Sequence, residues 1–282
     1  MNQQLIDMIV EEVLRQIELK GGAGSPVPAP EAEDITSAAV RARPLLHEIA
    51  DPEALERMMQ STTARIGVGR CGPRLKTQTR LTLRADHAQA RDAVFADVDQ
   101  KVLDSLGLFT VQSRCGDKDT YLTRPDLGRL LSDEAVKTLK ERCVPNPDVQ
   151  IFASDGLSST AIEANLAKIL PVLTDALAAR GLKVGTPYYL RFGRVGSQEH
   201  VAETLGAKVV CVLIGERPGL ATAESMSAYI AYNAYVGMPE SKRTVVSNIH
   251  KNGTAAVEAG AYVADVIEKI LEQKASGVEL VK

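Results

Sequence analysis

The sequence has few of the residues that build metal clusters or disulfide frameworks. It contains four cysteines and four histidines in 282 residues. The cysteines, Cys71, Cys115, Cys143 and Cys211, do not form close pairs. Zinc-binding domains and disulfide scaffolds require such pairs. We therefore expect reduced thiols that are mostly packed inside the fold, and we expect no metal site.

Long apolar runs and an excess of one charge are also missing. No stretch approaches the ~18–20 apolar residues that a membrane-crossing helix needs. Acids stand near the N-terminus, where a secretory signal has a cationic start and an unbroken apolar core. The formal net charge of −3 gives no overall attraction to nucleic acid or anionic lipid. We expect a cytoplasmic protein that binds neither nucleic acid nor membrane.

The patterns of common catalytic centres are absent too. The chain has no G-x-S-x-G elbow, no H-E-x-x-H motif and no Walker loop. Gly67, Gly69 and Gly72 match the G-x-G-x-x-G dinucleotide fingerprint. That fingerprint requires a strand before it and a helix opening within it. Here a polar helical stretch precedes the match and Pro73 follows it, so we reject a dinucleotide site at this position.

What is present is an ordinary globular composition, with 45% hydrophobic and 24% charged residues, and a length that suits two domains. The pattern predicts an amphipathic helix over residues 1–20, a flexible linker over 21–34, a smaller mixed α+β domain over 35–148 and an α/β domain over 149–282. The Pro-Asn-Pro run at 145–147 marks the boundary between the two domains.

The first segment places apolar residues at helical spacing with acids between them. They are Leu5, Ile6, Ile9, Val10, Val13, Leu14 and Ile17. Residues 21–34 are rich in glycine, proline and alanine, which is typical of a flexible tether. A tethered helix cannot bury its apolar stripe in its own domain, so we expect it to dock on a partner. The alternative is that it folds back onto the body of the protein.

In the segment 35–148 we predict a helix starting at Pro52, helices over 77–98 and 132–142, and a strand over 109–114. The same segment carries a basic run. Its members are Arg65, Arg70, Arg74, Lys76, Arg80 and Arg84. The run has no interleaved aromatic residues, so a protein interface or a solvated face fits it better than a nucleic-acid site.

After residue 148 strands and helices alternate. We predict strands over 149–153, 188–192 and 208–214, helices over 158–180, 198–205 and 254–273, and further short strands over 228–231 and 244–249. The first and third strands are continuously apolar, which indicates burial on both faces of a parallel sheet. The fold class is therefore α/β, with a Rossmann-like, doubly wound parallel sheet whose ligands bind at the carboxyl ends of the strands.

Glycine and polar residues meet at these strand ends. The first loop consists of Ser154, Asp155, Gly156, Leu157 and Ser158. The second loop contains Arg194 and Val195, and the third contains Glu216. Glycine lets backbone approach a ligand closely, and helix N-termini bind anions and amides. Each loop alone fits an ordinary turn, but the three together predict a ligand site. A site without a visible acid, base or nucleophile suggests a subunit that binds a cofactor while another chain performs the chemistry.

Several segments carry a resemblance to a known family. They read TTARIGVGRCGPR (62–74), ADH (85–87), DK (117–118), YLTRPD (121–126), SDGLS (154–158), GERPGL (215–220) and SNIH (247–250). In this order they resemble the small subunit of adenosylcobalamin-dependent ethanolamine ammonia-lyase, from about residue 62 to the C-terminus. The resemblance implies a hetero-oligomer that converts ethanolamine to acetaldehyde and ammonia by radical chemistry. It implies that the substrate site and the catalytic residues belong to the large subunit, and that this chain has no catalytic residue.

The resemblance also implies a cofactor site for adenosylcobalamin, with this chain on the lower face of the corrin. Its contacts would include Val195 and Glu216, with Arg194 and residues 154–158 in support. Some members of the family have cysteine where Val245 stands here, so a van der Waals or backbone contact survives at this position and a thiol-specific role does not. Cobalamin proteins that replace the benzimidazole ligand with histidine carry an Asp-x-His-x-x-Gly segment, which this sequence lacks. We therefore expect base-on binding.

Residues 1–20 resemble the encapsulation segments that bring enzymes into bacterial microcompartments, so we expect shell proteins as a second partner and the microcompartment as a location. A role in solubility or assembly is the alternative. Two other functions stay open for the chain as a whole. A nicotinamide-dependent oxidoreductase is disfavoured because no dinucleotide fingerprint follows Ala153, Phe192 or Ile214. The other is a nucleotide-binding assembly module without turnover.

Overall fold

The computed structural model describes Glu11 and residues 37–281, and the chain forms two compact units, Met1–Arg43 and Pro44–Lys282. The first unit contains helix α2 (Ala38–Arg41). The amphipathic helix predicted over residues 1–20 and the linker predicted over 21–34 lie outside the described residues, apart from Glu11. All the elements that follow belong to the second unit.

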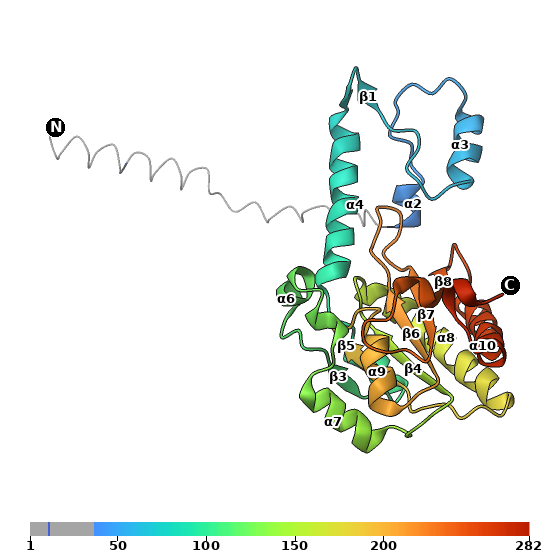
Figure 1. Ribbon diagram of the computed structural model, residues 1–282. Helices are drawn as coiled ribbons and strands as arrows, with labels where there is room; N and C mark the ends of the chain where they lie inside the picture. The colour runs from blue at the N-terminus through green and yellow to red at the C-terminus, as the bar shows by residue number, and fades with distance from the viewer. Residues whose placement is uncertain (1–10, 12–36, 282) are drawn as a thin grey trace. The chain divides into compact units, whose positions relative to one another are not determined.

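A six-stranded sheet forms the centre of the second unit (Figure 1). Its strands, in spatial order, are β3 (Thr110–Gln112), β5 (Tyr188–Arg191), β4 (Val149–Ser154), β6 (Val209–Gly215), β7 (Met226–Tyr232) and β8 (Arg243–Ile249). The first four run parallel, whereas β7 is antiparallel to both β6 and β8. The fold is therefore α/β with a mixed sheet.

The prediction of a parallel sheet throughout was wrong for the last two strands. Parallel neighbours need a long crossover, usually a helix. No helix lies between β6 and β7 or between β7 and β8 that could serve as one, since the only helical element there is the short 3-10 segment η2 (Glu240–Lys242). These two connections can only make antiparallel neighbours.

Strand β3 joins the two segments that the sequence separates. It was predicted within the segment 35–148, and it pairs in parallel with β5, with Thr110 opposite Tyr189. The segments 35–148 and 149–282 therefore share one sheet, and residues 44–148 lie in the same compact unit as residues 149–282.

Helices cover both faces of the sheet. Helices α8 (Ser159–Ala179) and α10 (Ala256–Gln273) pack on one face, and α7 (Asp133–Arg142) and α9 (Ser197–Leu205) on the other. Successive strand residues point to opposite faces, so Cys211 of β6 belongs to the first core and Val212 to the second. All four helices were predicted from the sequence and are confirmed, with ends that differ by a few residues at most.

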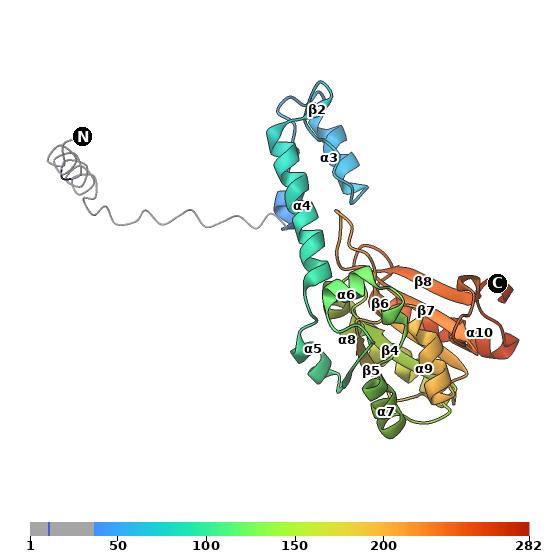
Figure 2. The ribbon, with the colours of Figure 1, turned by 60° about the vertical axis from the view of Figure 1, so that its left-hand side comes forward.

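The N-terminal part of this unit contains α3 (Pro52–Gln60), the hairpin of β1 (Arg70–Cys71) and β2 (Arg74–Leu75), and the long helix α4 (Thr77–Phe95). Gly72 has φ +57 in the turn between β1 and β2, a conformation that glycine adopts without strain. The G-x-G-x-x-G match thus lies in a hairpin that follows a helix, and it lacks the strand–turn–helix arrangement that the dinucleotide fingerprint requires. The hairpin stands at the end of α4 that is remote from the sheet (Figure 2).

The remaining elements are α5 (Gln100–Ser105), α6 (Lys118–Thr123), η1 (Leu127–Arg129) and η3 (Gly277–Glu279). All four cysteines are free, and only Cys71 is exposed, which confirms the prediction of unpaired and mostly packed thiols. Among the described residues no helix combines the length and the apolar character needed to cross a membrane.

Candidate functional site

The usual ligand crevice of an α/β sheet lies between the carboxyl ends of adjacent strands whose following helices pack on opposite faces. Here those strands are β4, which leads into α8, and β5, which leads into α9. Side chains of the chain itself fill this position. The carboxylate of Asp155 is 1% exposed, and the ammonium nitrogen of Lys118, which comes from α6, lies 3.0 Å from its Oδ2. The crevice is thus closed by an internal ion pair.

Asp155 and Ser154 fix the turn that follows β5. The Oδ1 atom of Asp155 accepts a hydrogen bond of 2.8 Å from the backbone N–H of Phe192, and the hydroxyl of Ser154 accepts one of 3.1 Å from that of Gly193. Phe192 has φ 58, a left-handed conformation that residues other than glycine rarely adopt. These hydrogen bonds hold Phe192 and Gly193, the two residues that precede Arg194.

The surroundings of the ion pair favour a structural role over proton transfer. Burial raises the pKa of the Asp155 carboxyl, and the Lys118 ammonium and the hydrogen bonds to the carboxylate oppose this shift. Lys118 also lies over the rings of Tyr121 and Phe192, at 5.3 and 5.2 Å from their centroids. Both carboxylate oxygens of Asp155 are thus engaged within the chain.

The same loop also holds the segment that follows β6. Gly156 has φ +53, and a Cβ atom there would lie 2.4 Å from the carbonyl oxygen of Gly215. The hydroxyls of Ser158 and Thr160 both donate to the carbonyl of Ala223, the latter at 2.9 Å. Residues 154–158 therefore join the three strand-end loops to one another.

A second and more open surface lies beside these loops on the antiparallel strands. We name Val195, Glu216, Tyr229 and Val245 the β7–β8 patch. Tyr229 and Val245 are direct partners across β7 and β8. The hydroxyl of Tyr229 donates to Oε1 of Glu216 at 3.3 Å, and both Val195 and Tyr229 pack against the second core. Tyr229 thus joins Glu216 to Val245, and Val195 packs against the same core.

The patch is open because helix α10 covers only one face of β7 and β8, and the patch lies on the other face. Val246 lies on the face that α10 covers and joins the first core. Val245 points to the opposite face and is 44% exposed, and Ser247 beside it is exposed as well. The side chain of Val245 is therefore accessible to a ligand or partner on this face.

Glu216 supplies the single acid of the β7–β8 patch. Burial, followed by the nearby Glu216 carboxylate, raises the pKa of the Tyr229 hydroxyl, so this group stays protonated and donates to Glu216. The side-chain amide of Gln198 donates to the carbonyl of Tyr229 at 2.7 Å and ties α9 to the same strand. The patch therefore offers apolar contact beside one carboxylate that can accept further hydrogen bonds.

Comparison with known proteins decides the family. The family model of the ethanolamine ammonia-lyase light chain (EutC) matches residues 52–281. The chain belongs to the ethanolamine ammonia-lyase small-subunit family. It is 56% identical over 248 residues to the ethanolamine ammonia-lyase small subunit of Fusobacterium nucleatum subsp. nucleatum, which covers 88% of this chain and 84% of that one. It is 52% identical over 284 residues to the small subunit of Clostridium tetani, covering 96% of each chain, and 45% identical over 294 residues to that of Listeria innocua serovar 6a, covering 99% and 100%.

Membership in the ethanolamine ammonia-lyase small-subunit family confirms the resemblance found in the sequence. The chain is accordingly a component of a lyase, and the description as a small subunit implies a large partner subunit. The family match begins at residue 52, ten residues or so before the first segment quoted for the resemblance.

The structure brings some of the predicted site residues together and separates others. Tyr229 joins Glu216 to Val245, and Val195 packs against the same core as Tyr229. Ser154, Asp155 and Ser158 are buried and face the neighbouring loops. Arg194 lies over the Tyr121 ring, 4.3 Å from its centroid, and its buried Nε has no hydrogen-bond partner in the described part of the chain.

Two residues that organise the site were not among the predicted site residues. Tyr229 lay within a predicted strand, and nothing in the sequence indicated that its hydroxyl meets Glu216. Lys118 lies in one of the segments that carry the resemblance, but its pairing with Asp155 spans elements far apart in the sequence. Between positions 37 and 281 no group of three or more histidine, cysteine, aspartate or glutamate side chains is arranged to hold a metal ion.

Proposed function

We propose that this chain holds adenosylcobalamin with its β7–β8 patch, against the large subunit of an ethanolamine ammonia-lyase that converts ethanolamine to acetaldehyde and ammonia. One observation carries the proposal. Glu216 and Val245, which the family resemblance assigns to the cofactor, come from distant parts of the sequence and are joined through Tyr229, which hydrogen-bonds Glu216 and pairs with Val245. Val195, the third of these residues, packs against the same core as Tyr229.

The chemistry of the patch suits this ligand. A corrin is a broad, largely apolar ring system with amide side chains at its rim. Val195 and Val245 offer apolar contact, and the Glu216 carboxylate accepts hydrogen bonds from amide N–H groups. Valine at position 245 supports contact by its methyl groups, and it supplies no thiol. Residues 154–158 support the same site by holding the loops that carry Val195 and Glu216.

The chain itself would position the cofactor and perform no bond-breaking step. When bound, adenosylcobalamin supplies the radical that starts the reaction, and the protein positions it. The acids, bases and substrate contacts of the reaction belong to the large subunit in this proposal. The side chains of this chain would bind one side of the corrin and exclude water from it.

We propose base-on binding, in which the cofactor keeps its own benzimidazole on cobalt. His250 hydrogen-bonds Asn248 at 2.8 Å, and Nδ1 of His200 accepts from the backbone N–H of Leu131 at 2.9 Å. Both rings are thus engaged within the chain. An electron paramagnetic resonance spectrum of the reconstituted complex with nitrogen hyperfine splitting from a protein histidine would contradict base-on binding.

The test of the site uses the complex with the large subunit. The two chains are co-expressed, loaded with adenosylcobalamin and passed over a desalting column, and the retained cobalamin spectrum and the ethanolamine-dependent acetaldehyde are measured. We expect Val245→Asp to weaken cobalamin retention by about tenfold or more, because it places a charge against an apolar ring. Val257→Asp, at an exposed position of α10 that is outside the patch, is the matched control.

If Val245→Asp and Val257→Asp reduced cobalamin retention equally, the assignment of the β7–β8 patch as the cobalamin site would be contradicted. Acetaldehyde production by this chain without the large subunit would contradict the division of roles. Retention of cobalamin by the wild-type complex with no ethanolamine-dependent product would leave the binding site standing and refute the reaction.

We also propose that residues 1–20 direct the complex into a microcompartment by binding its shell proteins. The support is the sequence pattern of an amphipathic helix on a Gly/Pro-rich tether. Deletion of residues 1–30 is expected to leave activity intact and to abolish co-localisation with a fluorescent shell protein. Unchanged co-localisation would refute this proposal.

A further inference from the structure

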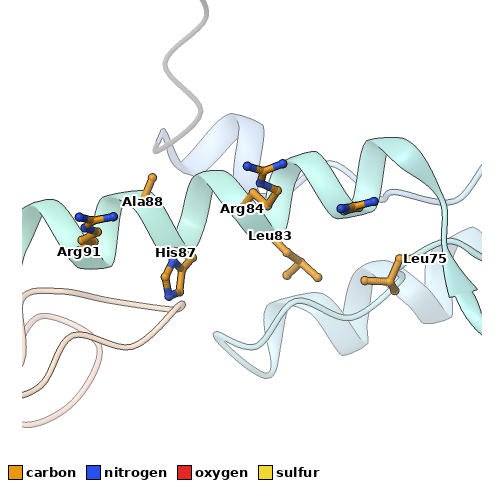
Figure 3. Close-up of a pocket in the computed structure, with 7 residues that line it drawn as sticks. Leu75, Leu83, Arg84, His87, Ala88 and Arg91 are labelled. Carbon is orange, nitrogen blue, oxygen red and sulfur yellow. The ribbon is translucent and has the colours of Figure 1, made fainter.

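Helix α4 carries a groove that the proposed cofactor site does not use. Figure 3 shows this groove, which has a volume of about 370 Å³. It is lined by Leu75, Arg80, Leu83, Arg84, His87, Ala88 and Arg91. At 3.6 residues per turn, the three arginines and His87 fall within an arc of about 60° and extend about 16 Å along the helix. We call these four residues the arginine face of α4.

The arginine face has no acidic partner within the described chain. None of Arg80, Arg84 and Arg91 forms an ion pair there, although the protein as a whole carries more acids than bases. Arg91 only lies over the Phe95 ring, 5.6 Å from its centroid. Arg65 behaves differently, since its guanidinium makes two hydrogen bonds to the carboxylate of Asp86.

The side of α4 that serves the fold lies elsewhere on the helix. Thr79, Asp86, Ala90 and Ala93 are its buried residues. The hydroxyl of Thr79 accepts a hydrogen bond of 3.0 Å from the backbone N–H of Gly69, which fixes the preceding loop to this side. Like charges three and four positions apart destabilise a helix. The arginine face therefore does not contribute to the stability of α4.

We infer that the arginine face of α4 binds an acidic surface of the large subunit. The inference rests on the proposed function because it needs that partner. Unpaired guanidinium groups on a rigid helix bind carboxylates in a bidentate manner, and arginine is enriched at protein interfaces. Leu75 and Leu83 add apolar surface to the groove, as a protein partner requires. In the groove, the arginines would orient the partner through their charge, and the leucines would add affinity through apolar contact.

The same features disfavour a nucleic acid as the occupant. Single strands stack their bases on aromatic side chains, and the lining contains no phenylalanine, tyrosine or tryptophan. A duplex is bound through its phosphates by an extended basic surface, whereas the lining holds three arginines and His87 beside two leucines and an alanine. The experiment below distinguishes binding of a polyanion such as a nucleic acid from binding of the large subunit.

The experiment measures the affinity of the full-length chain for the purified large subunit by sedimentation velocity at 50 and 300 mM salt. Arg84→Glu with Arg91→Glu reverses two charges of the face, and Arg84→Lys with Arg91→Lys keeps them. Lys137→Glu with Lys140→Glu, at exposed positions of α7, makes the same change of net charge elsewhere. Circular dichroism checks that each variant keeps its helical content.

We expect the glutamate pair to weaken the complex by roughly tenfold or more at low salt and to reduce its salt dependence. The affinity of the Arg84→Lys, Arg91→Lys variant for the large subunit should stay within about threefold of the wild-type value. The affinity of the Lys137→Glu, Lys140→Glu variant should stay within about twofold. Equal affinities for all four proteins would overturn the inference and leave the proposed function standing. Loss of heparin binding by the glutamate pair, with an unchanged subunit affinity, would also overturn it and assign the groove to a polyanion. No complex with the wild type would refute the proposed function itself.

Discussion

The ammonium group of Lys118 lies 3.0 Å from the buried carboxylate of Asp155, so that helix α6 is joined to the end of strand β4 by an ion pair. Their side chains are 11% and 1% exposed. Removing one partner leaves the other charge buried and unpaired. We expect Asp155→Asn to lower the free energy of unfolding by about 3–5 kcal/mol, measured by urea denaturation.

The control for this variant is Asp126→Asn. Asp126 pairs with Arg124 at 2.7 Å, and both side chains are more than half exposed. Surface ion pairs contribute about 1 kcal/mol or less to the free energy of unfolding. Asp126→Asn should therefore lower that free energy only slightly. Lys118→Met combined with Asp155→Asn should recover part of the loss. Equal effects of the two single variants would mean that the Lys118–Asp155 pair is solvated in solution.

A second prediction concerns the close contact of two strand-end loops at Gly156. Gly156 and Gly181 both have positive φ, but a Cβ would meet the Gly215 carbonyl only at position 156 and open space at 181. Gly181→Ala should therefore lower the free energy of unfolding by about 1–2 kcal/mol, the cost of the left-handed backbone alone. Gly156→Ala should lower the free energy of unfolding clearly more than Gly181→Ala does, because the loops that follow β4 and β6 must move apart to admit the methyl group. Matching denaturation curves for the two variants would rule out the close contact.

A third prediction concerns the carboxylate of the β7–β8 patch. Glu216→Gln keeps the shape of the side chain and removes its charge. We expect the complex with the large subunit to bind cobalamin about tenfold more weakly, because a hydrogen bond to a charged acceptor becomes a neutral one. Glu258→Gln on α10 is the control. Spectroscopic titration with cobalamin measures both, and an unchanged affinity for Glu216→Gln would remove this residue from the site.

The four thiols should differ sharply in reactivity. Burial raises the pKa of Cys211 to about 12 and that of Cys143 to about 11, and it also raises the pKa of Cys115. Because the thiolate is the reactive form, Ellman's reagent at pH 8 should label one thiol in the native protein, the exposed Cys71, and all four in guanidinium. Cys71→Ser should leave none reactive in the native state. Rapid labelling of a second thiol would contradict the packing described here.

A fifth prediction concerns His200 and acid stability. Burial, and then the charge of Arg114, lowers the pKa of His200. Its Nδ1 accepts a hydrogen bond from the backbone N–H of Leu131, which requires an unprotonated nitrogen. The folded chain thus binds this proton less readily than the unfolded chain, so stability is full above about pH 6.5 and falls as the pH drops below it. His200→Gln should flatten this part of the curve of Tm against pH.

The sequence predicted those parts of the fold that depend on local pattern. The apolar runs of β4 and β6 and the periodic spacing of α8 and α10 are confirmed, because each is decided by residues next to one another. The direction of β7 and β8 was missed, since a short strand reads the same whichever way its neighbour runs. The pairing of Thr110 with Tyr189 was missed because long-range contacts leave no local pattern.

The candidate site shows the same limit. Glycine and polar residues at the strand ends correctly indicated where the loops gather. The pattern could not show that Lys118 fills the crevice between β4 and β5, or that the open surface lies on Tyr229 and Val245 instead. Both facts depend on which distant side chains meet, and the positions of Val195, Glu216 and Val245 came from the family resemblance rather than from spacing.

Strand β3 is synthesised early and paired late. Its only neighbour in the sheet is β5, which follows α6, α7, β4 and α8 along the chain. Strand β4 likewise has both of its neighbours, β5 and β6, downstream. On the ribosome, the growing chain therefore exposes unpaired strand edges until residues beyond 215 have emerged. We expect the nascent chain to need chaperone protection during this interval, and subunit assembly to wait until translation is almost complete.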